Sequence, residues 1–152
     1  MRRYGDLTRA EMEAIDRKNT IVLIPIGALE QHGNQLPLAT DDIIADETVA
    51  YIDRELEADF PILLFPLMPI GVSTEHMNFC GTVSLRPDTL YRMLYDICKS
   101  LARHDFVKIA FLISHGSNMF QVLSRELRSE LGSACFSLTS RRSLASRRRR
   151  LR

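Results

Sequence analysis

Three long apolar runs constrain the fold of this chain more than any other feature. They read TIVLIPIG at residues 20–27, PILLFPLMPIG at 61–71 and VKIAFLI at 107–113. A strand that is apolar at nearly every position must be covered on both faces, which is typical of a parallel sheet between layers of helices. We therefore predict three buried strands, the second of which ends near Pro66.

Segments with helical spacing separate these runs. The clearest covers residues 86–106, with Pro87 in its first turn, where proline is well tolerated. Its apolar stripe consists of Leu90, Leu94, Ile97 and Leu101. Further helices are predicted over residues 11–19, 43–56 and 118–132. This alternation of strands and helices predicts an α/β domain built on a parallel sheet.

Polar clusters follow each of the predicted strands. They comprise residues 30–41, 73–81 and 115–118. The carboxyl ends of parallel strands meet at one edge of a sheet, where ligand sites commonly form. We therefore expect the three clusters to converge at that edge, so that side chains distant in the sequence share one site.

Four side chains in these clusters are candidate metal ligands. Glu30 and His32 are two residues apart, so an extended chain places them on one face. Asp41 follows a loop that could fold back, and His115 adds a second imidazole from another strand end. Carboxylates and imidazoles suit zinc, manganese or iron, so the pattern predicts a divalent-metal site, or a two-metal site bridged by Asp41. On the simpler alternative, Asp41 and Asp42 only cap the helix that follows.

Glu75 and His76 form a second polar pair, after the second strand. His76 is a candidate for orienting substrate or moving a proton, because an imidazole titrates near neutral pH. The alternative is a loop histidine that is hydrogen-bonded to the backbone. Cys80, in the same segment, lies near the predicted edge, although no local motif marks it as a nucleophile.

Composition restricts the compartment and the partners of the chain. No apolar stretch reaches the roughly 18 residues that a membrane-spanning helix needs, and no apolar signal region follows the basic N-terminus. Cys80, Cys98 and Cys135 show no CxxC or zinc-finger spacing, and an odd, scattered set of cysteines is more typical of reduced thiols than of a disulfide framework. These features predict a cytoplasmic protein without a membrane partner.

Three ordered blocks of the sequence resemble motifs of the creatininase (creatinine amidohydrolase) family. They read PIGALEQHGNQLPLATD at residues 25–41, GVSTEHMNFCGTVSL at 71–85 and SLARHDFVKIAFLISHGSN at 100–118. The resemblance implies a parallel-sheet α/β/α sandwich with a two-metal site at the strand ends. It also implies hydrolysis of a non-peptide C–N bond, of the cyclic amide or formamide type, by a metal-activated water. A small-molecule amide substrate and a homo-oligomer are implied as partners.

The resemblance also suggests roles for particular residues of this chain. The matching metal-ligand positions are Glu30, His32, Asp41 and His115. Asp41 matches the ligand that bridges two ions, which would be zinc, manganese or iron. Glu75 and His76, in the second block, are predicted to be catalytic residues that help to position the substrate.

The chain departs from the family pattern at several positions. Ser117 stands where creatininase itself has a glutamate that binds the second metal, and Cys80 replaces a proline. A further family block, resembling H-A-G-E-x-x-T-S, supplies a histidine and a glutamate near the metals and has no counterpart in this sequence. The alternative prediction is therefore a degenerate or truncated member that keeps the fold and part of the metal binding but not turnover.

The composition changes abruptly after Gly132. The remaining sequence reads SACFSLTSRRSLASRRRRLR, and seven of its last twelve residues are arginine. We predict a creatininase-like α/β domain over residues 1–132, incomplete at its C-terminus, and a disordered or non-native tail over 133–152. Clustered arginines could instead bind nucleic acid or an anionic surface. They have no interleaved aromatic residues, so we expect no nucleic-acid partner.

Overall fold

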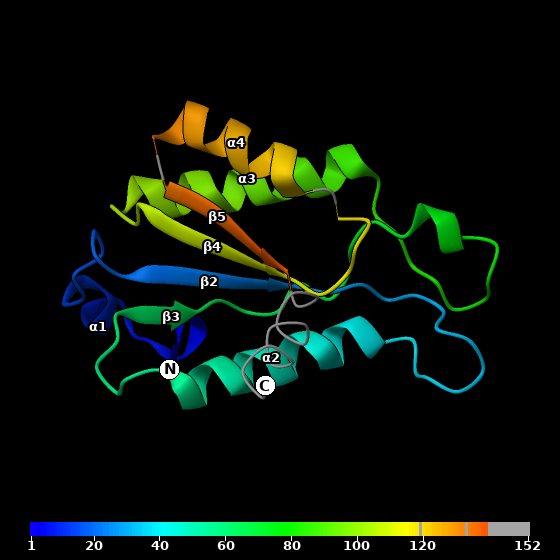
Figure 1. Cartoon of the computed structure of the whole chain (residues 1–152). Coiled ribbons are helices and arrows are strands. Elements are labelled where there is room, and N and C mark those ends of the chain that lie inside the picture. Colours follow the sequence, from blue (N-terminus) through cyan, green and yellow to red (C-terminus); the bar gives the residue numbers. More distant parts are fainter. Residues whose placement is uncertain (119, 133, 140–152) are drawn as a thin grey trace, which may run out of the picture.

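A parallel sheet forms the centre of the molecule (Figure 1). The computed structural model describes residues 1–118, 120–132 and 134–139. The strands are β1 (Arg2–Arg3), β2 (Ile21–Ile26), β3 (Ile62–Leu64), β4 (Lys108–Ile113) and β5 (Ala134–Thr139). Their spatial order is β1-β3-β2-β4-β5, and every pairing between them is parallel. The predicted parallel α/β fold is therefore confirmed.

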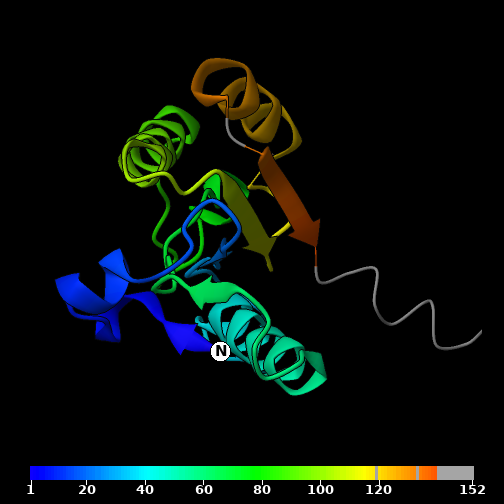
Figure 2. The same ribbon diagram turned by 90° about the vertical axis from the view of Figure 1, so that its left-hand side faces the viewer.

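Helices cover both faces of this sheet. They are α1 (Arg9–Glu13), α2 (Thr40–Glu55), α3 (Pro87–Arg103) and α4 (Phe120–Leu131), with 3-10 turns η1 at Tyr4–Asp6 and η2 at Thr74–His76. α3 and α4 lie on one face, and α2 lies on the other (Figures 1 and 2). The result is a three-layer α/β/α arrangement. No described helix is long and apolar enough to cross a membrane.

β2 and β4 form the buried middle of the sheet and explain two of the continuous apolar runs. The two strands pair in parallel along their full length. Because successive side chains point to opposite faces, Ile24 of β2 packs in the cluster that contains Leu94 of α3. Leu23 packs in a second cluster, with Val49 of α2. Both faces of β2 are therefore buried, as its apolar sequence predicts.

α3 matches its prediction closely, whereas α1 is shorter than predicted. The buried members of the predicted α3 stripe are Leu90, Leu94 and Leu101. α1 ends at Glu13 rather than near Asn19. The side chain of Asp16 accepts hydrogen bonds from the backbone and side-chain amides of Asn19. These bonds close a turn where the helix was predicted to continue.

The sheet extends further along the chain than predicted. Sequence analysis ended the folded domain at residue 132, but residues 134–139 form β5, which pairs with β4. Within this strand Cys135 is buried, whereas Phe136 and Leu138 are exposed. This alternation is typical of a strand with one covered face, and the serines and arginines around it concealed the pattern. The rest of the predicted tail, residues 140–152, lies outside the described residues.

Candidate metal centre

The candidate ligands come together at the carboxyl edge of the sheet. Glu30 and His32 follow β2, and Asp41 lies in the first turn of α2. His115 follows β4. The backbone N–H of Glu30 donates a hydrogen bond to the carbonyl of Leu38 at 3.0 Å. This bond closes the loop between β2 and α2 and brings Asp41 back to Glu30.

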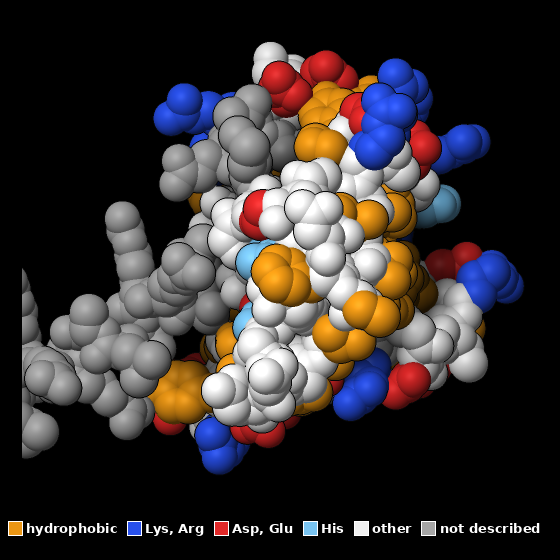
Figure 3. All heavy atoms as spheres, turned by 90° about the vertical axis from the view of Figure 1, so that its right-hand side faces the viewer, with side chains coloured by type: hydrophobic (Ala, Val, Ile, Leu, Met, Phe, Trp, Pro, Cys, Tyr) orange, Lys and Arg blue, Asp and Glu red, His pale blue; other side chains and the backbone are white. Residues whose placement is uncertain are grey.

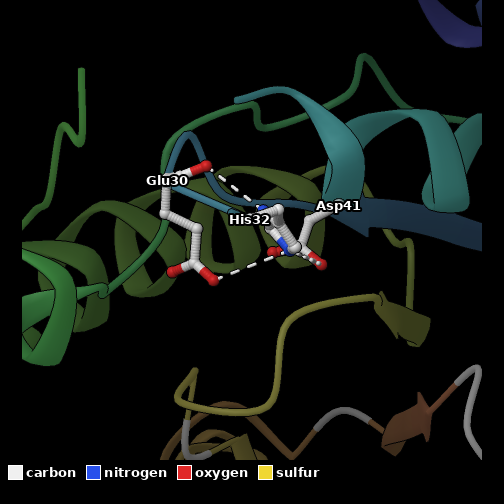
Figure 4. A group of neighbouring side chains, drawn as sticks. All are labelled: Glu30, His32 and Asp41. Carbon is white, nitrogen blue, oxygen red and sulfur yellow. Dashed lines mark hydrogen bonds and ion pairs between the residues drawn. The ribbon is translucent and has the colours of Figure 1, made fainter. Parts of the chain in front are cut away.

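Glu30, His32 and Asp41 point toward one another (Figure 4). One ligand atom from each side chain lies within 4.8 Å of the others. His32 Nε2 is 3.8 Å from Glu30 Oε1 and 3.8 Å from Asp41 Oδ1. His32 Nδ1 is 3.2 Å from the backbone carbonyl of Glu30. An Nδ1–H group that donates to this carbonyl leaves the unprotonated Nε2 facing two carboxylates, which is the arrangement of a metal-binding histidine.

His115 completes this group from β4. Its Nδ1 lies 3.1 Å from Asp41 Oδ2 and 3.4 Å from Glu30 Oε1. Its Nε2 lies 3.0 Å from the carbonyl of Val72. Both ring nitrogens face oxygen acceptors, and this arrangement favours the protonated, positively charged form of the His115 ring. Burial lowers the pKa of His115, but the hydrogen bond to Asp41 and the charges of Glu30 and Asp41 outweigh burial and raise the pKa above its ordinary value.

Burial makes the two carboxylates costly without a cation beside them. Glu30 is 3% exposed and Asp41 is 5% exposed. Oε2 of Glu30 has no hydrogen-bond partner among the described residues. A buried polar atom without a partner costs about 1–3 kcal/mol, and more when it is charged. The carboxylates and imidazoles present therefore fit a divalent cation.

η2 places Glu75 and His76 beside this group. His76 Nε2 is 3.6 Å from Glu30 Oε1. Its Nδ1 is 2.9 Å from the side-chain nitrogen of Gln31, so a side chain orients the ring, unlike in the loop-histidine alternative. Glu75 accepts a hydrogen bond from the hydroxyl of Ser117. This bond is the main cause that lowers the pKa of Glu75 below its ordinary value.

The helix-cap alternative for Asp41 and Asp42 is wrong. The N-cap of α2 is Ala39, and no side chain forms a capping hydrogen bond there. Asp42 instead packs over Gly27, where an added Cβ would lie 1.9 Å from Asp42 Oδ1. Burial, followed by the charge of Asp41, raises the pKa of Asp42 to about 6. Asp42 therefore packs against the exit from β2 rather than capping α2.

Asn118 contributes to this centre in a way that sequence analysis missed. It is 5% exposed. Its Oδ1 accepts a hydrogen bond from the backbone N–H of Val72 at 2.9 Å, and its Nδ2 donates to the carbonyl of Gly27 at 3.2 Å. The Asn118 amide thus joins the segments that follow β2, β3 and β4. Its place at the end of the third sequence block was the signal that could have found it.

Apolar side chains surround the centre on the surface. Figure 3 views the molecule from the carboxyl edge of the sheet, where histidine side chains reach the surface between apolar ones. The exposed apolar side chains of the two loops at this edge are Leu36, Leu38, Met77, Phe79 and Val83. The rings of His76 and Phe79 are 6.2 Å apart. The polar groups therefore lie within an apolar surround, as in many small-molecule sites.

Comparison with known proteins identifies the class to which this chain belongs. The family model described as "Creatininase: Creatinine amidohydrolase" matches residues 5–151. The chain is therefore a member of the creatininase family. The resemblance found in the three sequence blocks is confirmed by this match, which covers most of the chain rather than the motifs alone.

Curated relatives with two different names match the chain. A mycofactocin precursor peptide peptidase from Mycobacterium tuberculosis is 33% identical over 121 residues, which cover 76% of this chain and 48% of the relative. A creatinine amidohydrolase from Pseudomonas putida is 28% identical over 136 residues, which cover 82% of this chain and 51% of the relative. The chain thus spans about half the length of these curated relatives.

Solved structures share the same fold. A structure named "Creatininase Mn" superposes with a TM-score of 0.67 at 26% identity, covering 90% of this chain and 57% of that chain. A putative creatinine amidohydrolase from Bacteroides fragilis superposes with a TM-score of 0.76 at 23% identity, covering 91% and 55%. The second match shows the fold alone. The parallel α/β/α sandwich of this chain is therefore of the creatininase type.

Proposed function

We propose that this chain binds a divalent metal and hydrolyses an amide C–N bond, with a non-peptide amide of the cyclic or formamide type as substrate. The observation that carries the proposal is the meeting of Glu30, Asp41 and His115 at one point, with a buried oxygen of Glu30 unpaired among the described residues. Buried carboxylates need a compensating positive charge, which a divalent ion supplies. Membership of the creatininase family supports the same chemistry.

Backbone carbonyls orient the two histidines among the four proposed metal ligands. The four ligands are Glu30, His32, Asp41 and His115. The two histidines each place one ring nitrogen next to a carbonyl, which directs the other toward the carboxylates. Such a site would supply Lewis acidity, which acidifies water and polarises an amide carbonyl. Related structures named manganese and Zn-Zn forms of creatininase support zinc or manganese, with iron as a third candidate.

Asp41 is the proposed shared ligand of two ions. Its Oδ1 lies 3.8 Å from His32 Nε2, whereas its Oδ2 lies 3.1 Å from His115 Nδ1. The two carboxylate oxygens therefore face different imidazoles. Because a carboxylate can coordinate through both of its oxygens, Asp41 would be able to serve two ions, with His32 and His115 as the imidazole ligands.

His76 and Glu75 are proposed to position the substrate and to move a proton. Because His76 Nδ1 accepts from Gln31, the ring proton of the neutral histidine lies on Nε2, 3.6 Å from Glu30 Oε1. His76 can donate that proton to a leaving nitrogen held beside the carboxylates. Glu75, which stays ionised through its bond from Ser117, can accept a hydrogen bond from a substrate N–H group.

A peptide amide is the second candidate substrate. The relative named as a peptidase shares 33% identity with this chain, against 28% for the creatinine amidohydrolase. A peptide bond is also a C–N amide bond, so the same residues would take the same roles. Parallel assays with creatinine, an N-formyl compound and short peptides distinguish the two substrate classes.

Metal content of the purified chain tests the proposal. We expect metal in elemental analysis, a lower melting temperature after chelation, and loss of the metal in Asp41→Ala. Asp46→Ala is the matched control, because Asp46 is exposed on the same helix. Metal retained by Asp41→Ala would contradict the proposal. Bound metal without turnover of any of the three amides would favour the alternative, a family member that keeps fold and metal but not catalysis.

We also propose that the chain forms a homo-oligomer. β5 is the last strand of the described sheet and exposes Phe136 and Leu138. Exposed apolar residues on an edge strand favour association with another protein surface. Light scattering on the protein as it elutes from a size-exclusion column measures the mass of the oligomer directly. A monomer at micromolar concentration would contradict this proposal and would leave the metal centre unaffected.

A further inference from the structure

Gln31 connects the two loops beside the candidate metal centre. Its backbone N–H donates a hydrogen bond to the hydroxyl of Thr82 at 3.2 Å. Next to this bond, Leu29 and Val83 form an antiparallel bridge, in which the N–H of Val83 donates to the carbonyl of Leu29 at 2.9 Å. The loop after β2 is thereby fixed to the segment after β3, which also carries His76. The Gln31 side chain consequently lies against the His76 ring.

The hydrogen bonds of the Gln31 amide determine which atom faces His76. The backbone N–H of Gly33 donates to Gln31 Oε1 at 3.0 Å, and a backbone N–H can only donate, so the amide oxygen must lie on that side. The amide nitrogen, Nε2, therefore lies on the other side, 2.9 Å from His76 Nδ1. Because this NH₂ group is a donor only, His76 Nδ1 must accept. The proton of the neutral His76 ring is assigned to Nε2 on this basis.

The ring of His32 has the opposite arrangement. Its Nδ1 lies 3.2 Å from the backbone carbonyl of Glu30, which is an acceptor, so its Nε2 is left with a lone pair (Figure 4). The Nε2 atoms of both histidines lie near the same atom, Glu30 Oε1, at 3.8 Å for His32 and 3.6 Å for His76. A metal ion binds a ring nitrogen only through a lone pair. Of these two rings, His32 therefore offers a ligand atom, whereas His76 offers an N–H donor.

We propose that Gln31 is a positioning residue that keeps His76 out of the metal's ligand set and reserves its Nε2–H for the substrate. This inference rests on the proposed function and adds a residue to it. Gln31 acts through His76 and does not itself touch the reacting atoms. The chemical basis is one atom, because an amide NH₂ beside Nδ1 makes Nε2 a donor, whereas an oxygen there makes Nε2 available to an ion, as it does in His32.

The first test locates the ring protons of His76 by ¹⁵N NMR of histidine-labelled protein at about pH 8, where an unperturbed imidazole is neutral. His76→Gln identifies the His76 signals by their loss. In the unchanged protein we expect Nδ1 without a proton and Nε2 with one, both in metal-free protein and after saturation with zinc. Gln31→Glu keeps an acceptor for the Gly33 N–H but places an oxygen beside Nδ1. In that variant we expect a proton on Nδ1.

The second test measures zinc affinity and turnover. We expect Gln31→Glu to bind zinc about tenfold more tightly, because a carboxylate beside Nδ1 frees Nε2 of His76 to bind the ion. The gain should disappear when His76→Gln is added. The kcat/KM for the preferred amide should fall by about 100-fold, since the proton donor is lost. Gln35→Glu is the matched control, because Gln35 is exposed in the same loop, and it should alter neither the His76 protons nor turnover.

Several results would overturn the role of Gln31. They are a proton on Nδ1 in the unchanged protein, an unchanged His76 signal in Gln31→Glu, or an equal gain in zinc affinity in Gln35→Glu. If Gln31→Glu does not fold, the zinc-saturated unchanged protein decides, because loss of its Nε2 proton would show that His76 is a ligand. The ring protons are read without substrate. The expected protons together with no turnover of any amide would therefore refute the proposed reaction and leave the role of Gln31 intact.

Discussion

The Nδ1 atom of His115 lies 3.1 Å from Oδ2 of Asp41 and thereby connects the end of β4 to the first turn of α2. The same nitrogen lies 3.4 Å from Oε1 of Glu30, which follows β2. The segments that follow the two central strands, β2 and β4, therefore form opposite sides of one site. Changes on the β4 side can be tested while the loop after β2 stays intact.

Replacement of His115 should weaken metal binding directly. We expect His115→Ala to reduce metal affinity by at least about tenfold, because losses of that size follow even from changes to groups that only orient a ligand. Titration calorimetry with zinc and manganese measures the affinity. His104→Ala is the control, since His104 is exposed at the end of α3. Equal affinities of His115→Ala and the unchanged protein would remove His115 from the ligand set.

Replacement of His76 should separate catalysis from metal binding. We expect His76→Ala to lower kcat/KM for the preferred amide by about 100-fold, which is typical for loss of a proton-transfer group. Metal content should stay unchanged, because the proposed ligands remain in place. Elemental analysis beside the amide assay checks both expectations. Loss of metal together with activity would show instead that His76 is a ligand through Nε2, which faces Glu30.

Replacement of Asn118 should destabilise the fold. Asn118→Ala leaves the buried N–H of Val72 and the carbonyl of Gly27 without their described side-chain partner. We expect a loss of about 2–3 kcal/mol in the free energy of unfolding, measured by urea denaturation. Asn78→Ala, at an exposed position, should change it by less than about 0.5 kcal/mol. Similar stability of the two variants would show that the Asn118 amide does not join these segments.

A side chain at position 27 should conflict with Asp42. In Gly27→Ala, the new Cβ would lie 1.9 Å from Asp42 Oδ1. We expect a loss of about 1–3 kcal/mol in the free energy of unfolding. Adding Asp42→Ala should restore part of it, with a coupling of at least about 0.5 kcal/mol between the two sites. Gly5→Ala is the control, because an added Cβ at Gly5 meets nothing within 4 Å. Strictly additive losses would contradict the contact.

The central strands and the candidate ligands were predictable because local patterns determine them. A strand buried on both faces must be apolar throughout, so β2 and β4 were visible in the sequence. Parallel strands place the residues after them at one edge, which predicted the meeting of Glu30 with His115. The same reasoning fails for contacts that depend on the assembled fold. The hydrogen bonds of Asn118 are one example, because only the assembled fold brings Val72 and Gly27 beside its side chain.

The ends of the fold were harder to predict. β1 contains only Arg2 and Arg3, which are too few residues for an alternating pattern. β5 does alternate, but only Cys135 and its neighbours carry the signal, inside a segment dominated by serine and arginine. α1 ends early because the side chain of Asp16 accepts hydrogen bonds from Asn19, and this turn competes with the helix. In each case a short local interaction or a pairing with another strand determined where the element begins or ends, and the composition of the segment did not reveal it.

The parallel pairing of β2 with β4 has a consequence for how the protein folds during synthesis. Glu30, His32 and Asp41 are synthesised early, whereas His115 follows only after β3 and α3. Until β4 docks beside β2, a nascent chain can offer only the first three side chains to an ion. An ion that prefers the complete set lowers the free energy of the docked state by mass action. The supply of metal during synthesis would then influence the fraction of chains in which β4 stays docked beside β2. It would thereby influence the yield of folded protein.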